Sequence, residues 1–486
     1  MDELTAFGEI VLVVAAGFTL ALLSTKVSER FPVPSPAIFL LAASLASEIF
    51  PALEPVSIRE VERIGVVAVL VILFEGGMGI GLRRFRRAAV PITLLGLVGT
   101  LATAGLMAVF AHAVVGFSWT VAWILAAALA PTDPAVTFSV LGDREIRGRT
   151  GLTLEGESGI NDPVGVALVI GMIDYAAHAD SSLWAVPQEF AIEMSVGLAI
   201  GIAGGLVLVP LARRFSLPSE SLYPLRTLLF AGVVYGAAAA ARGSGFLAVF
   251  VAGLIVGDAR LPFKGEIERF QSAMSSLAEL VVFVALGLTV DLTSLGRGHL
   301  WLDGLALAAL LAFVARPAVA TVLLLPVRFR WRERLFVSWG GLKGAVPILL
   351  AAFAVLGRIE GAERIYDIVF VVVAFSVVVN GTLIPSVADR LAIPMTRSRA
   401  APWTVSVDLE HEPRGLRQYV VATRSRADGT AVRELPLGEH AWISLVIRDG
   451  AAVQPRGSHV LRGGDEVVVL TEPEHEPAIR RVFEGV

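Results

Sequence analysis

The sequence predicts an all-α polytopic membrane protein with about 13 transmembrane helices, followed by a small C-terminal α/β cytoplasmic domain. Of its 486 residues, 55% are hydrophobic and only 17% are charged, which is far more apolar than a soluble protein of this length. Long apolar runs follow one another up to residue 391, where the composition changes. We therefore expect a membrane unit over residues 1–391, a polar linker over 392–402 and a soluble domain over 403–486.

A helix needs roughly 20 residues to cross the hydrocarbon core of a membrane, and most of the apolar runs approach or exceed that length. The first run follows Asp2 and Glu3 rather than a basic segment, so we expect a span and not a cleaved signal peptide. The second and ninth runs are the shortest. The expected spans cover residues 7–24, 34–50, 64–81, 90–115, 118–141, 156–177, 187–212, 222–241, 243–258, 270–291, 300–326, 334–356 and 364–391.

Basic residues in the connecting loops predict the orientation of these spans. Arg83, Arg84, Arg86 and Arg87 follow the third span, whereas the loops on the opposite side carry few basic residues, such as Arg242. Loops rich in lysine and arginine stay in the cytoplasm. We therefore expect a multi-pass protein of the cell (inner) membrane, surrounded by lipid, with its amino terminus outside and its carboxyl terminus in the cytoplasm.

The soluble segment is expected to contain short strands and one helix. The runs TVSVDLE, QYVVATRS, AWISLVIRD and EVVVL are typical of strands, and Asp-Gly and Gly-Gly pairs between them favour turns. The final segment, EHEPAIRRVFEG, is expected to be helical. The chain contains no cysteine, which excludes disulfides, thiol chemistry and thiolate metal sites.

Ionisable residues inside the spans are candidates for function, because each costs about 2.5–3.5 kcal/mol at the membrane centre even on a lenient scale. The acids outnumber the bases, as the path of a cation requires. These residues are Glu75, Asp133, Glu157, Asp162, Glu193, Glu279, Arg316 and Lys343.

Two of the spans are expected to be broken. In the fifth span, Pro131 and Pro134 flank Thr132 and Asp133, so the helix is interrupted and backbone groups are freed. The twelfth span contains WGGLKGAVP, where glycines and a proline surround Lys343. Interrupted helices at corresponding places in two halves of a chain indicate the binding site of a transporter.

The sixth span contains GESGINDP, in which Ser158 and Asp162 are four residues apart and share one side of a helix. A dehydrated alkali cation needs several hard oxygen ligands, and Asp162, Asn161, Ser158 and Thr132 can supply them together with freed carbonyl groups. Burial away from water favours the protonated form of a carboxyl group. A proton and a monovalent cation can therefore compete for Asp162.

Structural roles are the alternative for these acids. Asp133 and Asp162 each precede a proline, as an N-cap residue does at the start of a helix. A helix start at membrane depth is itself a discontinuity, so we favour ion binding for both. Glu75 is either a ligand or the buried partner of a basic residue.

Other charged groups are expected to be structural. Glu157 and Lys343 are expected to form an ion pair, and Arg316 is expected to have a structural role. Glu193 and Glu279 are expected to lie near water.

The stretch GESG also resembles the Gly-x-Ser-Gly stretch of rhomboid-type intramembrane serine proteases. That chemistry needs a base, usually a histidine inside the membrane and within reach of Ser158. None of the seven histidines lies in the middle of an expected span; His112 is near an outer end, and His178 and His299 lie in outer loops. Metal-hydrolase, P-loop and dinucleotide motifs are also missing from the sequence, so no cofactor is expected.

Five stretches carry a family resemblance. They are LFEGGM (73–78), APTDPA (130–135), EGESGINDPVGVAL (155–168), SGFLAVFVAGLIVGD (244–258) and SWGGLKGAVPILLA (338–351). In this order they resemble the monovalent cation:proton antiporters, specifically the Asn-Asp branch of sodium(potassium)/proton exchangers. Five ordered matches are much more specific than any one motif.

The resemblance implies a thirteen-span fold built as an inverted repeat, with a six-helix core that crosses at two unwound helices. It also implies a separate dimerisation part, so a homodimer is expected. The implied cation and proton site is Asp162, with Asn161, Ser158, Thr132 and Glu75 nearby.

One position departs from the family. Its members often carry arginine where this chain has Lys343. Lysine keeps the positive charge opposite Glu157 but loses the bidentate fork of a guanidinium group.

By resemblance, the chain is expected to be an antiporter and not an enzyme, exchanging K⁺ or Na⁺ for protons by alternating access. A single carboxylate in the Asn-Asp pair favours one proton for one cation, and this branch is regarded as electroneutral; Asp133 leaves a second charge open. A cation channel is the alternative, and it would pass current without proton coupling. No nucleic-acid partner is expected.

The tail over residues 429–483 resembles the C-terminal half of potassium-conductance regulator domains of the TrkA type (TrkA-C, or RCK-C). By resemblance, this tail dimerises and senses a small cytoplasmic ligand; a passive assembly domain is the alternative. The association of such domains with potassium-handling proteins favours K⁺.

Overall fold

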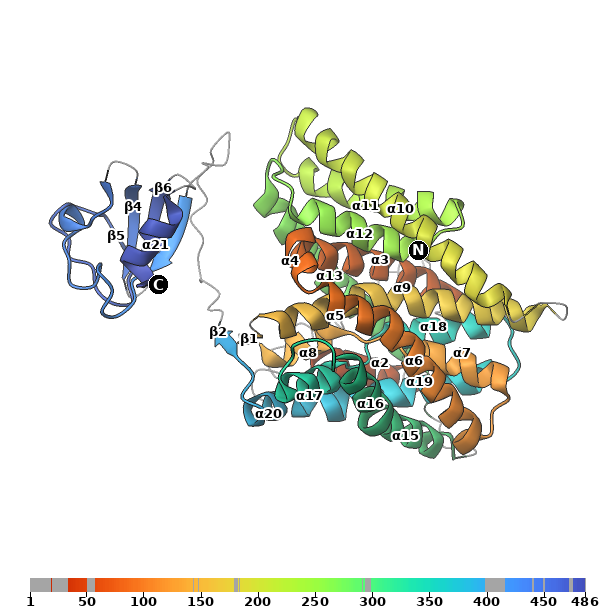
Figure 1. Ribbon diagram of the computed structural model, residues 1–486. Helices are drawn as coiled ribbons and strands as arrows, with labels where there is room; N and C mark the ends of the chain where they lie inside the picture. The colour runs from red at the N-terminus through yellow and green to blue at the C-terminus, as the bar shows by residue number, and fades with distance from the viewer. Residues whose placement is uncertain are drawn as a thin grey trace. The chain divides into compact units, whose positions relative to one another are not determined.

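The structure is a computed structural model that describes Thr19 and residues 34–49, 57–397 and 416–485, with short gaps at 143, 147, 179–181, 183, 291, 293–298, 439–440, 449–450 and 472–474. The chain divides into two compact units, Met1–Ala400 and Ala401–Val486 (Figure 1). The first expected span, 7–24, lies outside the described residues apart from Thr19. The run TVSVDLE also lies outside them.

The first unit is a helical membrane bundle. Among the described residues, nine helices are long and apolar enough to cross a membrane, and three shorter apolar helices accompany them. Their positions match the second to the thirteenth expected spans, which confirms the all-α polytopic class. The α-helices are α2 (Ser35–Ile49), α3 (Ile58–Ile80), α4 (Leu82–Arg87), α5 (Ala89–Thr93), α6 (Thr100–Phe110), α7 (Trp119–Leu129), α8 (Pro134–Leu141), α9 (Arg149–Ala177), α10 (Ala185–Arg214), α11 (Leu222–Ala240), α12 (Gly245–Gly257), α13 (Lys264–Leu288), α15 (Leu300–Leu310), α16 (Arg316–Leu323), α17 (Trp331–Gly340), α18 (Val346–Leu356), α19 (Ala362–Phe375) and α20 (Thr382–Arg390).

Several spans contain π-helical turns, which widen a helix locally. These turns are η2 (Leu94–Gly99), η3 (Ala111–Val115), η5 (Leu311–Ala315) and η6 (Ser376–Gly381). Turns of this kind occur often near functional sites. In η2 a Cβ atom at Gly96 would lie only 2.7 Å from the Cβ atom of Ile160 on α9. The absence of a side chain at Gly96 therefore lets this span approach α9 closely.

Helices α3 and α12 pack backbone to backbone. Ser57 and Glu60 form a capping box that fixes the start of α3. Farther along the helix, a Cβ atom at Gly253 of α12 would lie 2.5 Å from the carbonyl oxygen of Phe74. Small residues permit such close packing inside a membrane, where dispersion contacts replace the hydrophobic effect.

A short two-stranded sheet joins two distant parts of the membrane unit. Strand β1 (Arg144–Ile146) pairs antiparallel with β2 (Met395–Arg397). The first part of the expected linker, 392–402, therefore belongs to the folded membrane unit. The Arg144 guanidinium also lies 3.1 Å from Asp389, but both groups are exposed and such surface pairs contribute little.

The second unit is a four-stranded antiparallel sheet with a helix and a short 3₁₀ turn, η7 (Val432–Glu434). Its strands are β3 (Leu416–Val420), β4 (Ala441–Arg448), β5 (Ala451–Val453) and β6 (Glu466–Thr471), in the order β3-β6-β4-β5. Helix α21 (Glu476–Glu484) packs Ile479, Val482 and Phe483 into the same apolar cluster as Tyr419 and Val467. Three of the expected strands and the expected helix are present.

One ion pair joins the neighbouring ends of β4 and β6, the two central strands of this sheet. Arg448 donates to both carboxylate oxygens of Asp465 at 2.8 and 2.7 Å, and the backbone N–H of Arg462 donates to the same carboxylate at 2.8 Å. The Arg448 hydrogen bonds lower the pKa of Asp465 below its ordinary value, against the opposing effect of burial. The ionised form of Asp465 therefore stabilises the fold.

We expect Asp465→Asn to lower the free energy of unfolding of this domain by about 2 kcal/mol, the range typical of hydrogen bonds to charged groups. Because the folded-state pKa is lowered, the contribution is complete above the ordinary carboxyl range and disappears as the pH falls through the lowered value. Hydrogen exchange of the β4 and β6 amides in the full-length protein measures it, after correction for intrinsic rates. Glu434→Gln, on the exposed surface, is the control, and equal protection in both variants at neutral pH would contradict the assignment.

Candidate functional site

The two broken helices meet at their breaks. Helix α7 ends at Leu129 and α8 begins at Pro134, whereas α17 ends at Gly340 and α18 begins at Val346. The N–H of Asp133 donates to the carbonyl oxygen of Leu342 at 2.7 Å, and the Thr137 hydroxyl donates to that of Gly340 at 2.9 Å. Both expected interruptions are therefore present, and each satisfies backbone groups that the other exposes.

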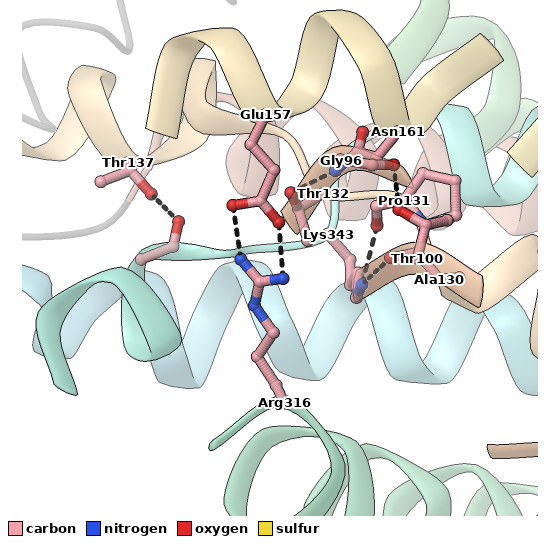
Figure 2. A network of polar contacts seen from close by, with 11 residues as sticks. Gly96, Thr100, Ala130, Pro131, Thr132, Thr137, Glu157, Asn161, Arg316 and Lys343 are labelled. Atoms are coloured by element: carbon pink, nitrogen blue, oxygen red, sulfur yellow. Dashed lines mark hydrogen bonds and ion pairs between the residues drawn. The ribbon is translucent and has the colours of Figure 1, made fainter. Parts of the chain in front are cut away.

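Lys343 lies at the centre of this crossing (Figure 2). Its ammonium group donates to the carbonyl oxygens of Ala130 at 2.9 Å and Pro131 at 2.7 Å, and its backbone N–H donates to the Ser376 hydroxyl at 2.9 Å. The side chain is almost fully buried. A positive charge at this point complements the negative end of the α7 dipole and satisfies carbonyl groups that have no helical partner.

The expected ion pair between Glu157 and Lys343 is wrong. Glu157 on α9 instead pairs with Arg316, the first residue of α16, through contacts of 2.6 and 2.8 Å from the two guanidinium ends to the two carboxylate oxygens (Figure 2). Both side chains are buried. The planar fork of arginine fits a carboxylate in this two-point geometry, whereas the compact ammonium group of Lys343 is occupied by carbonyl groups.

Asp162 lies on α9, beside the crossing. The helix runs unbroken from Arg149 to Ala177 through Pro163, so Asp162 does not start a helix. The Ser158 hydroxyl donates to Oδ2 of Asp162 at 3.4 Å, and Oδ1 is buried without a hydrogen-bond partner among the described residues. Ser158 and Asp162 therefore share one side of the helix, as the spacing predicts.

Asn161 connects α9 to the break of the fifth span. Its side-chain amide donates to the Thr132 hydroxyl at 2.7 Å, and its Oδ1 atom is buried without a hydrogen-bond partner in the described part of the chain (Figure 2). Two neighbouring side chains, Asn161 and Asp162, thus each present a free buried oxygen atom. Buried polar atoms are nearly always paired, so this arrangement is suited to a bound ion or water.

Asp133 has both a structural contact and a place beside the site. As the N-cap of α8, its Oδ1 atom accepts from the N–H of Ala135 at 2.9 Å. Its carboxylate lies against Gly344, where a side-chain methyl group would overlap it. The charges of Asp133 and Lys343 both act on Asp162.

Three other acids lie apart from these contacts. Glu75 is half-buried and lines a cleft of about 380 Å³ with Arg84, Asp258 and Glu268, and none of the site residues described above lines that cleft. Glu193 lies near the start of α10, where its charge interacts with those of Glu189 and Asp174. Glu279 on α13 is half-buried, and its Oε1 atom has no hydrogen-bond partner among the described residues, so its expected place near water stays a prediction.

Comparison with known proteins gives the family. The model of the family described as "Sodium/hydrogen exchanger, transmembrane" matches residues 16–390. The chain belongs to the sodium/hydrogen exchanger family. The model of the TrkA-C domain matches residues 416–484 of this exchanger.

Curated relatives cover nearly the whole exchanger. A K⁺/H⁺ antiporter, NhaP, of Alkalimonas amylolytica is 33% identical over 482 residues, which are 97% of this chain and 83% of the relative. A K⁺/H⁺ antiporter, NhaP2, of Shewanella sp. (strain ANA-3) is 30% identical over 501 residues, 99% of this chain and 84% of the relative.

The fold also matches a solved structure. The sodium proton antiporter MjNhaP1 from Methanocaldococcus jannaschii at pH 8 superposes with a TM-score of 0.64 at 22% identity, covering 81% of this chain and all of that chain. Its family and its curated relatives show that the exchanger is a multi-pass cation:proton antiporter and not an enzyme, as the sequence predicts. The channel and protease alternatives have no support.

The Glu157–Arg316 pair is tested by a double-mutant cycle. Glu157→Gln leaves a buried guanidinium without its partner, and we expect a loss of about 3–5 kcal/mol in stability. Adding Arg316→Met should restore most of that loss, whereas adding Lys343→Met should not. Thermal unfolding in detergent measures each variant. Rescue by Lys343→Met alone would reinstate the pairing expected from the sequence.

The contact between Gly344 and Asp133 gives a second prediction. The methyl group of Gly344→Ala displaces the Asp133 carboxylate, and we expect cation-driven proton flux to fall at least about tenfold, because small misplacements in a reactive site are costly. Flux in proteoliposomes measures the effect. Gly232→Ala on α11, which meets open space, is the matched control. Equal flux in the two variants would show that the position of Asp133 is unimportant.

Proposed function

We propose that this exchanger carries K⁺ in exchange for protons at Asp162, with Na⁺ as the alternative cation. The observation that carries the proposal is the free, buried Oδ1 atom of Asp162 on the unbroken helix α9, next to the crossing of two broken helices. Half-helices that meet inside a membrane are typical of transporter binding sites. The names of the two K⁺/H⁺ relatives support K⁺, and so does the match to the TrkA-C domain.

The cation ligands in this proposal are all oxygen atoms. Asp162 offers its carboxylate, Asn161 its free Oδ1 atom, and Ser158 and Thr132 their hydroxyl oxygens. Hard cations prefer such ligands. Asp133 adds a second negative charge near the site. The bound ion is the transported substrate itself, and the proposed exchange uses no cofactor.

One carboxylate is sufficient for exchange. When a proton occupies Asp162, the negative charge that attracts the cation is lost, and when the cation occupies the site, protonation is disfavoured. One proton for one cation makes the cycle electroneutral. Transport of a second charge, for example with Asp133, would couple about 2.3 kcal/mol per 100 mV into each turnover.

The cellular arrangement forms part of the same proposal. Basic residues concentrate in alternate loops, which supports a cell (inner) membrane protein with its amino terminus outside and its carboxyl terminus in the cytoplasm. We assign residues 403–486 to a regulatory domain that binds a small cytoplasmic ligand, and we expect a homodimer that works by alternating access.

We expect Asp162→Asn to fold and to lose exchange, because asparagine keeps the shape of the side chain but can neither ionise nor release a proton. The assay uses proteoliposomes with an imposed pH gradient, an internal pH dye, and K⁺, Na⁺ or Li⁺ added in turn. Asp174→Asn, an exposed acid on the same helix, is the matched control. Normal exchange by Asp162→Asn would sink the mechanism.

Clamping the membrane potential in the same vesicles tests whether the exchange moves net charge across the membrane. Proton flux that follows one cation and is independent of the clamp supports electroneutral exchange and names the ion. If no cation moves protons in folded wild-type protein, the proposed substrate is wrong. Current without proton flux would favour a channel.

A further inference from the structure

The C-terminal domain contains a cleft of about 520 Å³. Its walls come from the ends of β4 and β5 and from the segment 456–462, which leads to β6. The volume lies within the range of about 300–1,000 Å³ that is typical of small-molecule sites. Among the described residues, the cleft is lined by three arginines, one histidine and four uncharged side chains, and by no acid. Such a lining favours a negatively charged ligand.

The three arginines of the cleft differ in their partners. Arg448 lies 2.7 Å from the Asp465 carboxylate and also donates to the carbonyl oxygen of Val460 at 2.7 Å, so its charge is balanced within the domain. Arg456 and Arg462 are exposed, and neither forms an ion pair in the part of the chain that the structure describes. Two positive charges at the cleft are therefore available to a ligand.

His459 distinguishes the cleft from a group of solvated surface arginines. The residue is half-buried, but its Nε2 atom is buried and has no hydrogen-bond partner among the described residues. Buried polar atoms are nearly always paired, so a ligand in the cleft would supply a partner that the domain itself lacks. With a proton on Nε2, the imidazole ring donates to an oxygen atom of that ligand.

Backbone hydrogen bonds hold the segment that carries these groups. The N–H of His459 donates to the carbonyl oxygen of Arg456 at 2.8 Å and closes a tight turn. The N–H of Val432 donates to the carbonyl oxygen of His459 at 2.8 Å. The N–H of Arg433 donates to that of Gly457 at 2.9 Å. The turn is thus fixed against η7, and groups that are fixed in advance lose less conformational entropy when a ligand binds.

We propose that this cleft binds a small molecule that carries phosphate groups. A phosphate group has close to two negative charges at neutral pH and offers several acceptor oxygens, and the planar fork of an arginine binds two of them at once. Arg456 and Arg462 supply the charge, and His459 and Ser458 supply further hydrogen bonds. The inference rests on the proposed regulatory role of residues 403–486 and gives its ligand a chemical class and a place in the domain.

Binding of inorganic pyrophosphate to the full-length protein tests the site. The protein is held in nanodiscs of phosphatidylcholine, which has no net charge, and calorimetry at fixed ionic strength gives the dissociation constant. We expect saturable binding, and we expect the dissociation constant to rise about tenfold or more in Arg456→Gln and in Arg462→Gln, which corresponds to about 1.4 kcal/mol. Arg426→Gln is the matched control, because Arg426 is an exposed arginine of the same domain that does not line the cleft.

A soluble compound and a lipid headgroup are both sources of phosphate, and a second set of nanodiscs separates them. These nanodiscs contain phosphatidylglycerol, and hydrogen exchange of the segment 456–462 is the readout in both sets. Protection by pyrophosphate in phosphatidylcholine that is lost in Arg456→Gln and Arg462→Gln supports a soluble ligand. Protection by phosphatidylglycerol alone that is lost in the same variants supports a lipid headgroup. If neither source gives protection that depends on these two arginines, the inference is overturned.

The binding site and the proposed regulatory role fail separately, because binding is measured without a cation gradient. In proteoliposomes, pyrophosphate is added on the side of the C-terminal domain, and cation-driven proton flux is recorded for wild type and Arg456→Gln. A change in flux that only the wild type shows would support both the site and its regulatory role. Pyrophosphate binding without any change in wild-type flux would support the site and contradict the regulatory role.

Discussion

The membrane unit depends on the satisfaction of backbone groups at two breaks where water is absent. An unpaired carbonyl or N–H group in this environment costs several kcal/mol. At the crossing, each break satisfies backbone groups of the other. The N–H of Asp133 donates to the carbonyl oxygen of Leu342, and the Lys343 ammonium group donates to the carbonyl oxygens of Ala130 and Pro131. These hydrogen bonds join the two half-helix pairs into one connected element.

The need to satisfy buried polar groups determines where Lys343 and Arg316 lie, and their positions determine the net charge around Asp162. The hydrogen bonds of Lys343 are used by backbone carbonyl groups, and Arg316 is used by Glu157. Asp162 therefore has no ion pair of its own among the described residues, although the charge of Lys343 still acts on it. Asp133 and Asp162 together carry two negative charges, whereas Lys343 brings one positive charge that acts on Asp162. In the proposed function, a mobile cation or a proton would supply the missing positive charge, as a reversible site requires.

The sequence predicts the breaks well and the pairing of charges poorly. Prolines and glycines act locally, so Pro131, Pro134 and the glycines around Lys343 indicate where the helices stop. The partner of Glu157 depends instead on how α9 and α16 approach in space, and a lysine and an arginine are equally plausible partners from letters alone. The two Asp-Pro pairs show the same limit. Asp133-Pro134 starts α8, whereas Asp162-Pro163 lies inside α9. The residues next to such a pair do not reveal whether the preceding turn is already helical, so the sequence alone cannot distinguish the two cases.

The site joins an unbroken helix to a broken one, and this junction explains how ion binding can act on the fold. Asp162 lies on the continuous helix α9, whereas Thr132 lies in the break and accepts a hydrogen bond from Asn161. An ion held by Asp162, Asn161 and Thr132 would bridge both elements. A proton on Asp162 neutralises the same charge without requiring ligands from the break. The two occupied states would therefore hold α9 and the break together to different degrees, and a ligand shifts a conformational equilibrium only through such a difference.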